Sequence, residues 1–177
     1  MTAPRLVVLC TGNAARSVMA GAILAVRVPH VPVTTAGTHV IEGMPMSWRT
    51  RDALTAVGIV APTHRSRQLT EEDVRSADVI IGFATEHVAY VRRTYPDAAA
   101  RAGTLKRLVR ELPGTSGDLP TRLAALDLDE VELEPWEEVA DPAGGDLPEF
   151  VSCAREILDL VDALVPELVP GVDSSVA

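Results

Sequence analysis

The chain has 177 residues, of which 47% are hydrophobic and 23% charged, proportions typical of a folded globular protein and not of a disordered one. Its formal net charge of −9 repels phosphate backbones, which argues against nucleic acid as a partner, and no apolar run approaches the roughly 20 residues that span a bilayer. We therefore expect a cytoplasmic protein without a membrane segment, with a single domain over residues 1–168 and a flexible tail over 169–177.

The first third of the chain predicts strands that alternate with helices. An apolar run over residues 5–9 predicts a buried strand, and apolar residues at helical spacing predict a helix over 17–28. A second strand is expected over 31–35, followed by a turn and a helix over 47–57 that ends at Gly58.

The remainder of the chain continues the alternation with one gap. A capping box at Thr70 precedes a strand over 79–83 and a helix over 85–95. The region 106–136 is too weakly periodic for us to place elements, whereas apolar residues recur at helical spacing from Phe150 onward. Strands alternating with helices predict a three-layer α/β fold with a parallel sheet, in which ligands bind beyond the carboxyl ends of the strands.

Between the first strand and the first helix lies a segment with the composition of an anion-binding loop. Small residues leave its backbone N–H groups accessible, and the start of a helix adds a partial positive charge. We expect phosphate to be bound by Thr11, Gly12, Asn13, Ala14, Ala15, Arg16 and Ser17, directly after Cys10.

The side chains of this loop suit nucleophilic attack on phosphorus. A helix N-terminus and nearby cations lower the pKa of a cysteine, which favours Cys10 as a thiolate nucleophile over a merely packed cysteine. Arg16 offers a planar fork of donors for two phosphate oxygens, and the hydroxyl of Ser17 can donate to the sulfur. Asn13 suits a left-handed turn that shapes the loop.

At these residues the chain resembles the low-molecular-weight protein tyrosine phosphatase family. The resemblance rests on residues 8–13 and 16–20 and on further motifs in family order: Ala36-Gly37-Thr38, His64 to Leu69, Ala77-Asp78 and Asp141-Pro142. It implies a four-stranded parallel sheet flanked by helices and a two-step hydrolysis through a phosphocysteine, with no cofactor and no metal.

The resemblance also assigns roles outside the loop. It implies that Asp141 is the general acid, as expulsion of an alkoxide or phenolate requires a proton. It implies a supporting network of Asn13, Ser17, Thr35 and His64, in which His64 is structural.

The expected substrate is a phosphorylated protein side chain or a small phosphate ester, with phosphotyrosine preferred on family grounds. Ala143 and Gly144 stand where tyrosine-specific relatives usually carry an aromatic pair, and Ala14 is smaller than the usual loop residue. The run from Asp141 to Gly145 is more similar to bacterial relatives that include protein arginine phosphatases, although those tend to have threonine at the position of Ala14. His39, Val40 and Trp48 are candidates for the mouth of the pocket.

Three alternatives to a tyrosine phosphatase stay open: a protein arginine phosphatase, a thiol-dependent arsenate reductase, and a non-catalytic phosphate or phosphopeptide-binding module. Many relatives carry a second cysteine beside the loop arginine, where this chain has Ala15. Cys153 is the other cysteine, and its place on the apolar face of the last helix predicts a packed core thiol. The oligomeric state is left open.

Overall fold

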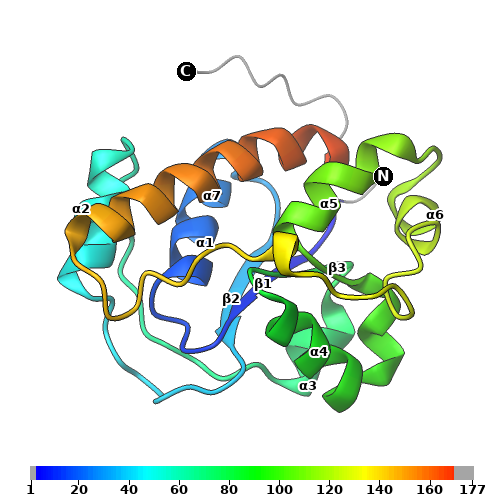
Figure 1. The fold of residues 1–177 in the computed structure, drawn as a ribbon, viewed down its shortest axis with the longest axis horizontal. Coiled ribbons are helices and arrows are strands. Elements are labelled where there is room, and N and C mark those ends of the chain that lie inside the picture. The colour runs from blue at the N-terminus through cyan, green and yellow to red at the C-terminus, as the bar shows by residue number, and fades with distance from the viewer. Residues whose placement is uncertain (1–2, 170–177) are drawn as a thin grey trace.

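The computed structural model describes residues 3–169, and Figure 1 shows how they are arranged. In chain order, with η for a 3₁₀ helix, the elements are β1 (Leu6–Cys10), α1 (Arg16–Arg27), β2 (Val33–Gly37), α2 (Trp48–Ala56), α3 (Glu71–Ser76), β3 (Val79–Gly82), α4 (Thr85–Thr94), η1 (Pro96–Arg101), β4 (Ala102–Thr104), α5 (Leu105–Glu111), η2 (Leu112–Gly114), α6 (Leu119–Ala124), η3 (Pro135–Glu137) and α7 (Leu147–Leu168). The tail predicted over 169–177 lies, beyond Val169, outside the described residues.

The strands form one parallel sheet in the order β2-β1-β3-β4. Leu6 of β1 pairs with Val33 of β2 on one side and with Val79 of β3 on the other. The carboxyl ends of the strands therefore lie at one edge of the sheet, where β1 ends in Cys10. The predicted three-layer α/β fold with a four-stranded parallel sheet flanked by helices is confirmed.

Both faces of β1 are covered, which explains its continuous apolar sequence. Leu6, Val8 and Cys10 belong to the larger core, which α1, α2 and α7 complete, while Val7 and Leu9 belong to the smaller core with α3 and α4. Figure 1 shows α1 and α7 on one side of the sheet and α3 and α4 on the other. The alternation of side chains along a strand thus places Cys10 on the side where α1 begins.

The second strand is shifted from its predicted range. The prediction was 31–35, but β2 runs over Val33–Gly37. Pro32 has no N–H to donate, and its carbonyl oxygen accepts a hydrogen bond from the Leu6 amide (2.9 Å) just before the strand starts. At the other end, Gly37 stays in the sheet and pairs with Cys10, which brings β2 up to the loop.

The region 106–136, where the sequence placed no elements, contains the short elements α5, η2, α6 and η3. Just before it, β4 has 3 residues, too few to show a periodic pattern, and α5 follows it directly. Thr104 ends the strand and caps the helix, because its hydroxyl accepts a hydrogen bond from the Arg107 amide (3.2 Å). Arg107 is itself buried, which obscures the polar face of α5 in the sequence.

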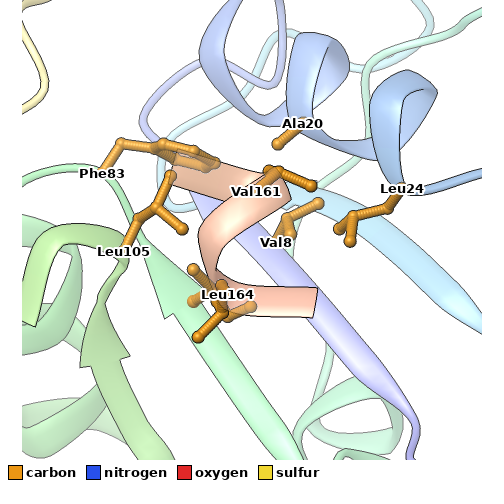
Figure 2. A pocket seen from close by; sticks show the side chains of 8 residues that line it. Val8, Ala20, Leu24, Phe83, Leu105, Val161 and Leu164 are labelled. Atoms are coloured by element: carbon orange, nitrogen blue, oxygen red, sulfur yellow. The ribbon is translucent and has the colours of Figure 1, made fainter. Parts of the chain in front are cut away.

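The larger core encloses a cavity of about 10 Å³ beneath α7. Figure 2 shows that apolar side chains surround it, among them Val8, Leu24, Val161 and Leu164. A water needs two or more polar partners, and this lining provides none, so we interpret the cavity as a packing gap and not as a binding site. Among the helices that the structure describes between residues 3 and 169, none is long and apolar enough to cross a membrane.

Candidate active site

Cys10 lies at the carboxyl end of β1 with its side chain buried. Its Sγ is 3.0 Å from Oγ of Ser17 in the first turn of α1, so residues 11–15 form a tight loop between the strand and the helix. Gly37 lies against this loop, and a Cβ there would come 2.5 Å from the carbonyl oxygen of Thr11. Only glycine leaves room for that approach.

The N-terminus of α1 has donors available for an anion. Ala15 is the N-cap residue and forms no side-chain cap, and the described first turn carries no acidic residue. The first amides of a helix have no partner within the helix, and its dipole favours negative charge at this end. Both features suit the binding of a phosphate group.

Asn13 holds the loop from inside. It is fully buried and adopts a left-handed conformation (φ 49°), as its sequence position suggested. Its Nδ2 donates to Oγ of Ser17 (2.9 Å), its Oδ1 accepts from the Arg67 amide (3.0 Å), and its carbonyl oxygen accepts from Nε2 of His64 (2.8 Å). Because Ser17 already accepts a proton from Asn13, its own hydroxyl proton is free to point at the sulfur of Cys10.

Thr35 differs from its expected role. It lies in β2 opposite Val8, and no hydrogen bond joins its hydroxyl to the loop among the described residues. Its Cγ2 instead lies against Gly21 of α1, where a Cβ would come within 2.4 Å. Thr35 therefore packs helix against sheet, whereas Asn13, Ser17 and His64 form the network that contacts the loop.

Arg16, at the start of α1, contacts residues that lie more than 120 positions later in the chain. Its guanidinium is buried and donates through Nη1 to the carbonyl oxygen of Val139 (3.1 Å) and through Nη2 to Oδ2 of Asp141 (2.7 Å). The side chain of Asp141 is 47% exposed, and its Oδ1 accepts from the Ala143 amide (3.0 Å). Two of the three predicted catalytic side chains, Arg16 and Asp141, are therefore in direct contact, and Arg16 is adjacent in the chain to Ser17, which contacts Cys10.

Comparison of this chain with known protein families gives a match that includes the loop. The family model described as low molecular weight phosphotyrosine protein phosphatase matches residues 5–124, well over half of the chain. The chain belongs to this family. The match includes the loop over residues 10–17 and ends before Asp141, and it confirms the resemblance noted in the sequence.

Full-length relatives of this phosphatase include enzymes named for two kinds of substrate. A protein-arginine-phosphatase of Geobacillus stearothermophilus is 31% identical over 165 residues, 93% of this chain and 95% of the relative. A probable low molecular weight protein-tyrosine-phosphatase, EpsP of Ralstonia nicotianae, is 28% identical over 163 residues, 92% of this chain and 94% of the relative.

Solved structures of the family superpose along nearly the whole chain. The YwlE arginine phosphatase from Geobacillus stearothermophilus has a TM-score of 0.74 at 30% identity, covering 93% of this chain and 92% of that one. The low molecular weight protein tyrosine phosphatase from T. tengcongensis has a TM-score of 0.73 at 28% identity, covering 92% and 98%. The protein is therefore a cysteine-dependent phosphatase of this family.

Sequence analysis missed a hydrogen-bonded chain on the far side of the phosphatase loop. Nδ1 of His87 accepts from the amides of Phe83 (3.0 Å) and Ala84 (3.1 Å), so the ring proton resides on Nε2. That nitrogen lies 3.1 Å from Oγ1 of Thr11, which donates to Oε1 of Glu86 (2.9 Å). Burial, with the nearby charge of Arg16, lowers the pKa of His87 to about 3, so the ring stays neutral. The sequence did hold one indication of this role: His87 follows shortly after the strand β3, at the edge of the sheet where ligands are expected.

The residues predicted for the mouth of the pocket lie at or near the surface. Ala14, His39, Ala143 and Gly144 are exposed, and Val40 is half-buried. Trp48, at the start of α2, is 54% exposed, with the guanidinium of Arg49 5.0 Å from its ring centre. Trp48 therefore does not pack in the core, and the carbonyl oxygen of Ala14 is tied to α2 through the hydroxyl of Thr50 (3.0 Å).

Cys153 lies in α7 and is buried in the larger core, as its sequence pattern predicted. Burial raises its pKa to about 12, which keeps it a thiol and a poor nucleophile. Among the described residues, 3–169, no group of three His, Cys, Asp or Glu side chains is placed to bind a metal ion.

Proposed function

We propose that Cys10 is the nucleophile of a protein phosphatase, that Arg16 and the loop amides bind the phosphoryl oxygens, and that Asp141 is the general acid. One observation carries this proposal: Ser17 contacts the sulfur of Cys10, while the adjacent Arg16 contacts Asp141 and the carbonyl oxygen of Val139. The proposed nucleophile and the proposed proton donor thus each contact one of two adjacent residues at the start of α1.

The reaction proceeds in two steps. The thiolate of Cys10 attacks phosphorus, the bond to the leaving group breaks, and Asp141 gives its proton to the departing atom. Asp141 then takes a proton from water, which attacks the phosphocysteine and releases inorganic phosphate and the thiolate. Ser17 stabilises the sulfur in both steps by its hydrogen bond, and Arg16 holds the charge of the transferring phosphoryl group.

Phosphotyrosine is the first candidate substrate, because it is the substrate after which the family is named. Phosphoarginine is the second, and specific observations favour it. A full-length relative is a protein-arginine-phosphatase, Ala143 and Gly144 provide no aromatic wall for a phenyl ring, and the carboxylate of Glu86 lies beside Thr11 of the loop, where a cationic side chain would be favoured.

The deciding experiment begins with p-nitrophenyl phosphate, a chelator and a reductant. Turnover by the wild type, no turnover by Cys10→Ser and slowed turnover by Asp141→Asn would support the mechanism. An arsenate reductase would need a thiol reductant and tolerate loss of Asp141, and a binding module would retain phosphopeptide without hydrolysing it. Either result overturns the proposal.

Peptides of one sequence carrying phosphotyrosine or phosphoarginine then decide the substrate. The phosphorylated side chain that is hydrolysed with the higher kcat/KM identifies the substrate class. Ala14→Thr is a matched probe, because arginine phosphatases tend to have threonine at this position. We propose a cytoplasmic location, because the mechanism requires Cys10 to stay reduced.

A further inference from the structure

Glu137 and Arg107 form a buried ion pair outside the proposed catalytic set. Glu137, in η3, is 0% exposed, and Arg107, in α5, is 3% exposed. The pair is bidentate: Nη2 of Arg107 donates to Oε1 of Glu137 (2.6 Å), and Nε donates to Oε2 (3.0 Å). Thr104 donates to Oε2 (2.7 Å) and the Glu134 amide to Oε1 (2.8 Å), so both carboxylate oxygens are fully occupied.

The geometry of this pair is tightly determined. Burial by itself would raise the pKa of Glu137, but hydrogen bonds from Arg107 and Thr104 outweigh it and keep the pKa below its ordinary value. A buried charge is tolerated only while its partners stay in place, and Arg107 is the only cation that contacts Glu137 among the described residues, so displacement of Arg107 would leave Glu137 as an unpaired buried ion. Arg107 is held in turn by Oε1 of Glu111 (2.9 Å) and by the carbonyl oxygen of Glu132 (2.8 Å). The pair therefore ties η3 to the junction of β4 and α5.

The residues that follow Glu137 are tied to other elements at the same edge of the sheet. Oε1 of Glu138 accepts from the amide (2.8 Å) and hydroxyl (2.7 Å) of Thr85 at the start of α4. The carbonyl oxygen of Glu138 accepts from Nζ of Lys106 (2.6 Å), and the Val139 amide donates to the carbonyl oxygen of Phe83 (2.8 Å). Three consecutive residues, 137–139, are thus each hydrogen-bonded to another element, and Ala140 alone separates them from Asp141.

Asp141 itself has few contacts of its own. Nearly half of its side chain is exposed, and its hydrogen bonds within the described chain are to Arg16 and to the Ala143 amide. A phosphate group would compete for the same guanidinium. The position of the acid during the reaction must then depend on the segment that leads to it.

We propose that Arg107 and Glu137 are positioning residues for Asp141. The inference rests on the proposed role of Asp141 as general acid. It assigns a positioning role to η3, which lies between α5 and α7. A displacement on the order of 1 Å in a catalytic group can cost about 100-fold in rate, so a loosened anchor should be visible in the chemistry.

Glu137→Gln tests the inference, because it removes the charge with little change in shape. The measurement is kcat/KM for aryl phosphates whose phenols range from strongly to weakly acidic, since only weakly acidic phenols need a proton as they leave. We expect a fall of about 10-fold for the least acidic phenol and less than about 2-fold for the most acidic. Glu167→Gln is the matched control, because Glu167 pairs with Arg122 between α7 and α6, away from the acid segment.

The same substitution in an Asp141→Asn background isolates the route of the effect. If Glu137 acts through Asp141, Glu137→Gln in the Asp141→Asn protein does not further change how kcat/KM depends on the acidity of the leaving phenol. An equal fall across the whole series, or an undiminished effect in the Asp141→Asn background, would overturn the inference while leaving the phosphatase mechanism intact. If Asp141→Asn alone leaves the profile unchanged, its acid role fails and this inference fails with it.

Thr85→Val repeats the test in case Glu137→Gln does not fold. It removes one hydrogen bond from the next anchor, at Glu138, with almost no change in volume. We expect a smaller change in the same direction. A flat profile in a folded Thr85→Val protein would count against positioning by this segment.

Discussion

Arg16 and Asp141 contact each other directly, with Nη2 2.7 Å from Oδ2, although they are 125 positions apart in the chain. The guanidinium that we assign to phosphate is thus shared with the carboxylate that we assign to proton transfer. Phosphate oxygens and the carboxylate must compete for it.

Removal of the Asp141 charge should therefore tighten phosphate binding while slowing the reaction. For Asp141→Asn we expect an inhibition constant for inorganic phosphate about 5-fold lower, the equivalent of about 1 kcal/mol for a half-exposed ion pair. In the same variant, kcat/KM for phenyl phosphate should fall by about 100-fold or more relative to the wild type. Competitive inhibition measures the first quantity, and Asp159→Asn, on the exposed side of α7, serves as the control. Weaker phosphate binding by Asp141→Asn would contradict the competition.

His87 should make the protein less stable in mild acid. Burial lowers its pKa from 6.5 to about 3 in the folded protein, so below the unfolded value the unfolded chain binds the proton more readily. Stability is complete above about pH 6.5 and is lost progressively as the pH falls towards 3, by about 2 kcal/mol at pH 5.

Denaturant unfolding between pH 7 and 5 measures this slope. His87→Gln should remove most of it, whereas His39→Gln, at an exposed position, should retain it. An unchanged slope in His87→Gln would show that other groups account for the acid sensitivity.

Gly21 should not tolerate a methyl group. A Cβ at this position in α1 would lie 2.4 Å from Cγ2 of Thr35, so Gly21→Ala should lower the free energy of unfolding by about 1–3 kcal/mol through overpacking. Helix propensity alone would favour alanine by about 1 kcal/mol, so the sign of the change decides which effect dominates. Thr35→Ser, which removes the opposing methyl, should restore most of the loss when combined with Gly21→Ala.

Excess peroxide should inactivate the protein irreversibly, because a sulfenic acid on Cys10 that meets no second thiol is oxidised by further peroxide to sulfinic and sulfonic acids. Ala15 occupies the loop position from which a second thiol could react with oxidised Cys10. The other cysteine, Cys153, is buried, and its pKa is raised to about 12. After peroxide treatment, we expect dithiothreitol to restore little activity, with no difference in Cys153→Ala. In Ala15→Cys, the new thiol can condense with the sulfenic acid of Cys10 to form a disulfide and water, so reductant should restore activity. Recovery in the wild type that Cys153→Ala abolishes would show that Cys153 does reach Cys10.

The sequence alone determined the features that depend on short stretches of chain. The apolar run of β1, the loop from Cys10 to Ser17 and the periodic apolar face of α7 each lie within about 20 residues, and both hydrogen bonds of the capping box at Thr70 are present. Backbone propensity and apolar periodicity act at this range, so the fold class followed from them. The family followed from the resemblance of the loop and of the later motifs, which appear in family order along the chain.

Only the tertiary structure decided which distant side chains meet at the site. That Arg16 contacts Asp141, that His87 orients Thr11, that Thr35 packs on Gly21, and that Glu137 is buried against Arg107 each depend on how loops close and layers pack. No local preference separates Glu137 from the exposed Glu132 and Glu134. What makes Glu137 different is a cation 30 positions earlier in the chain, which becomes its partner only when α5 packs in place.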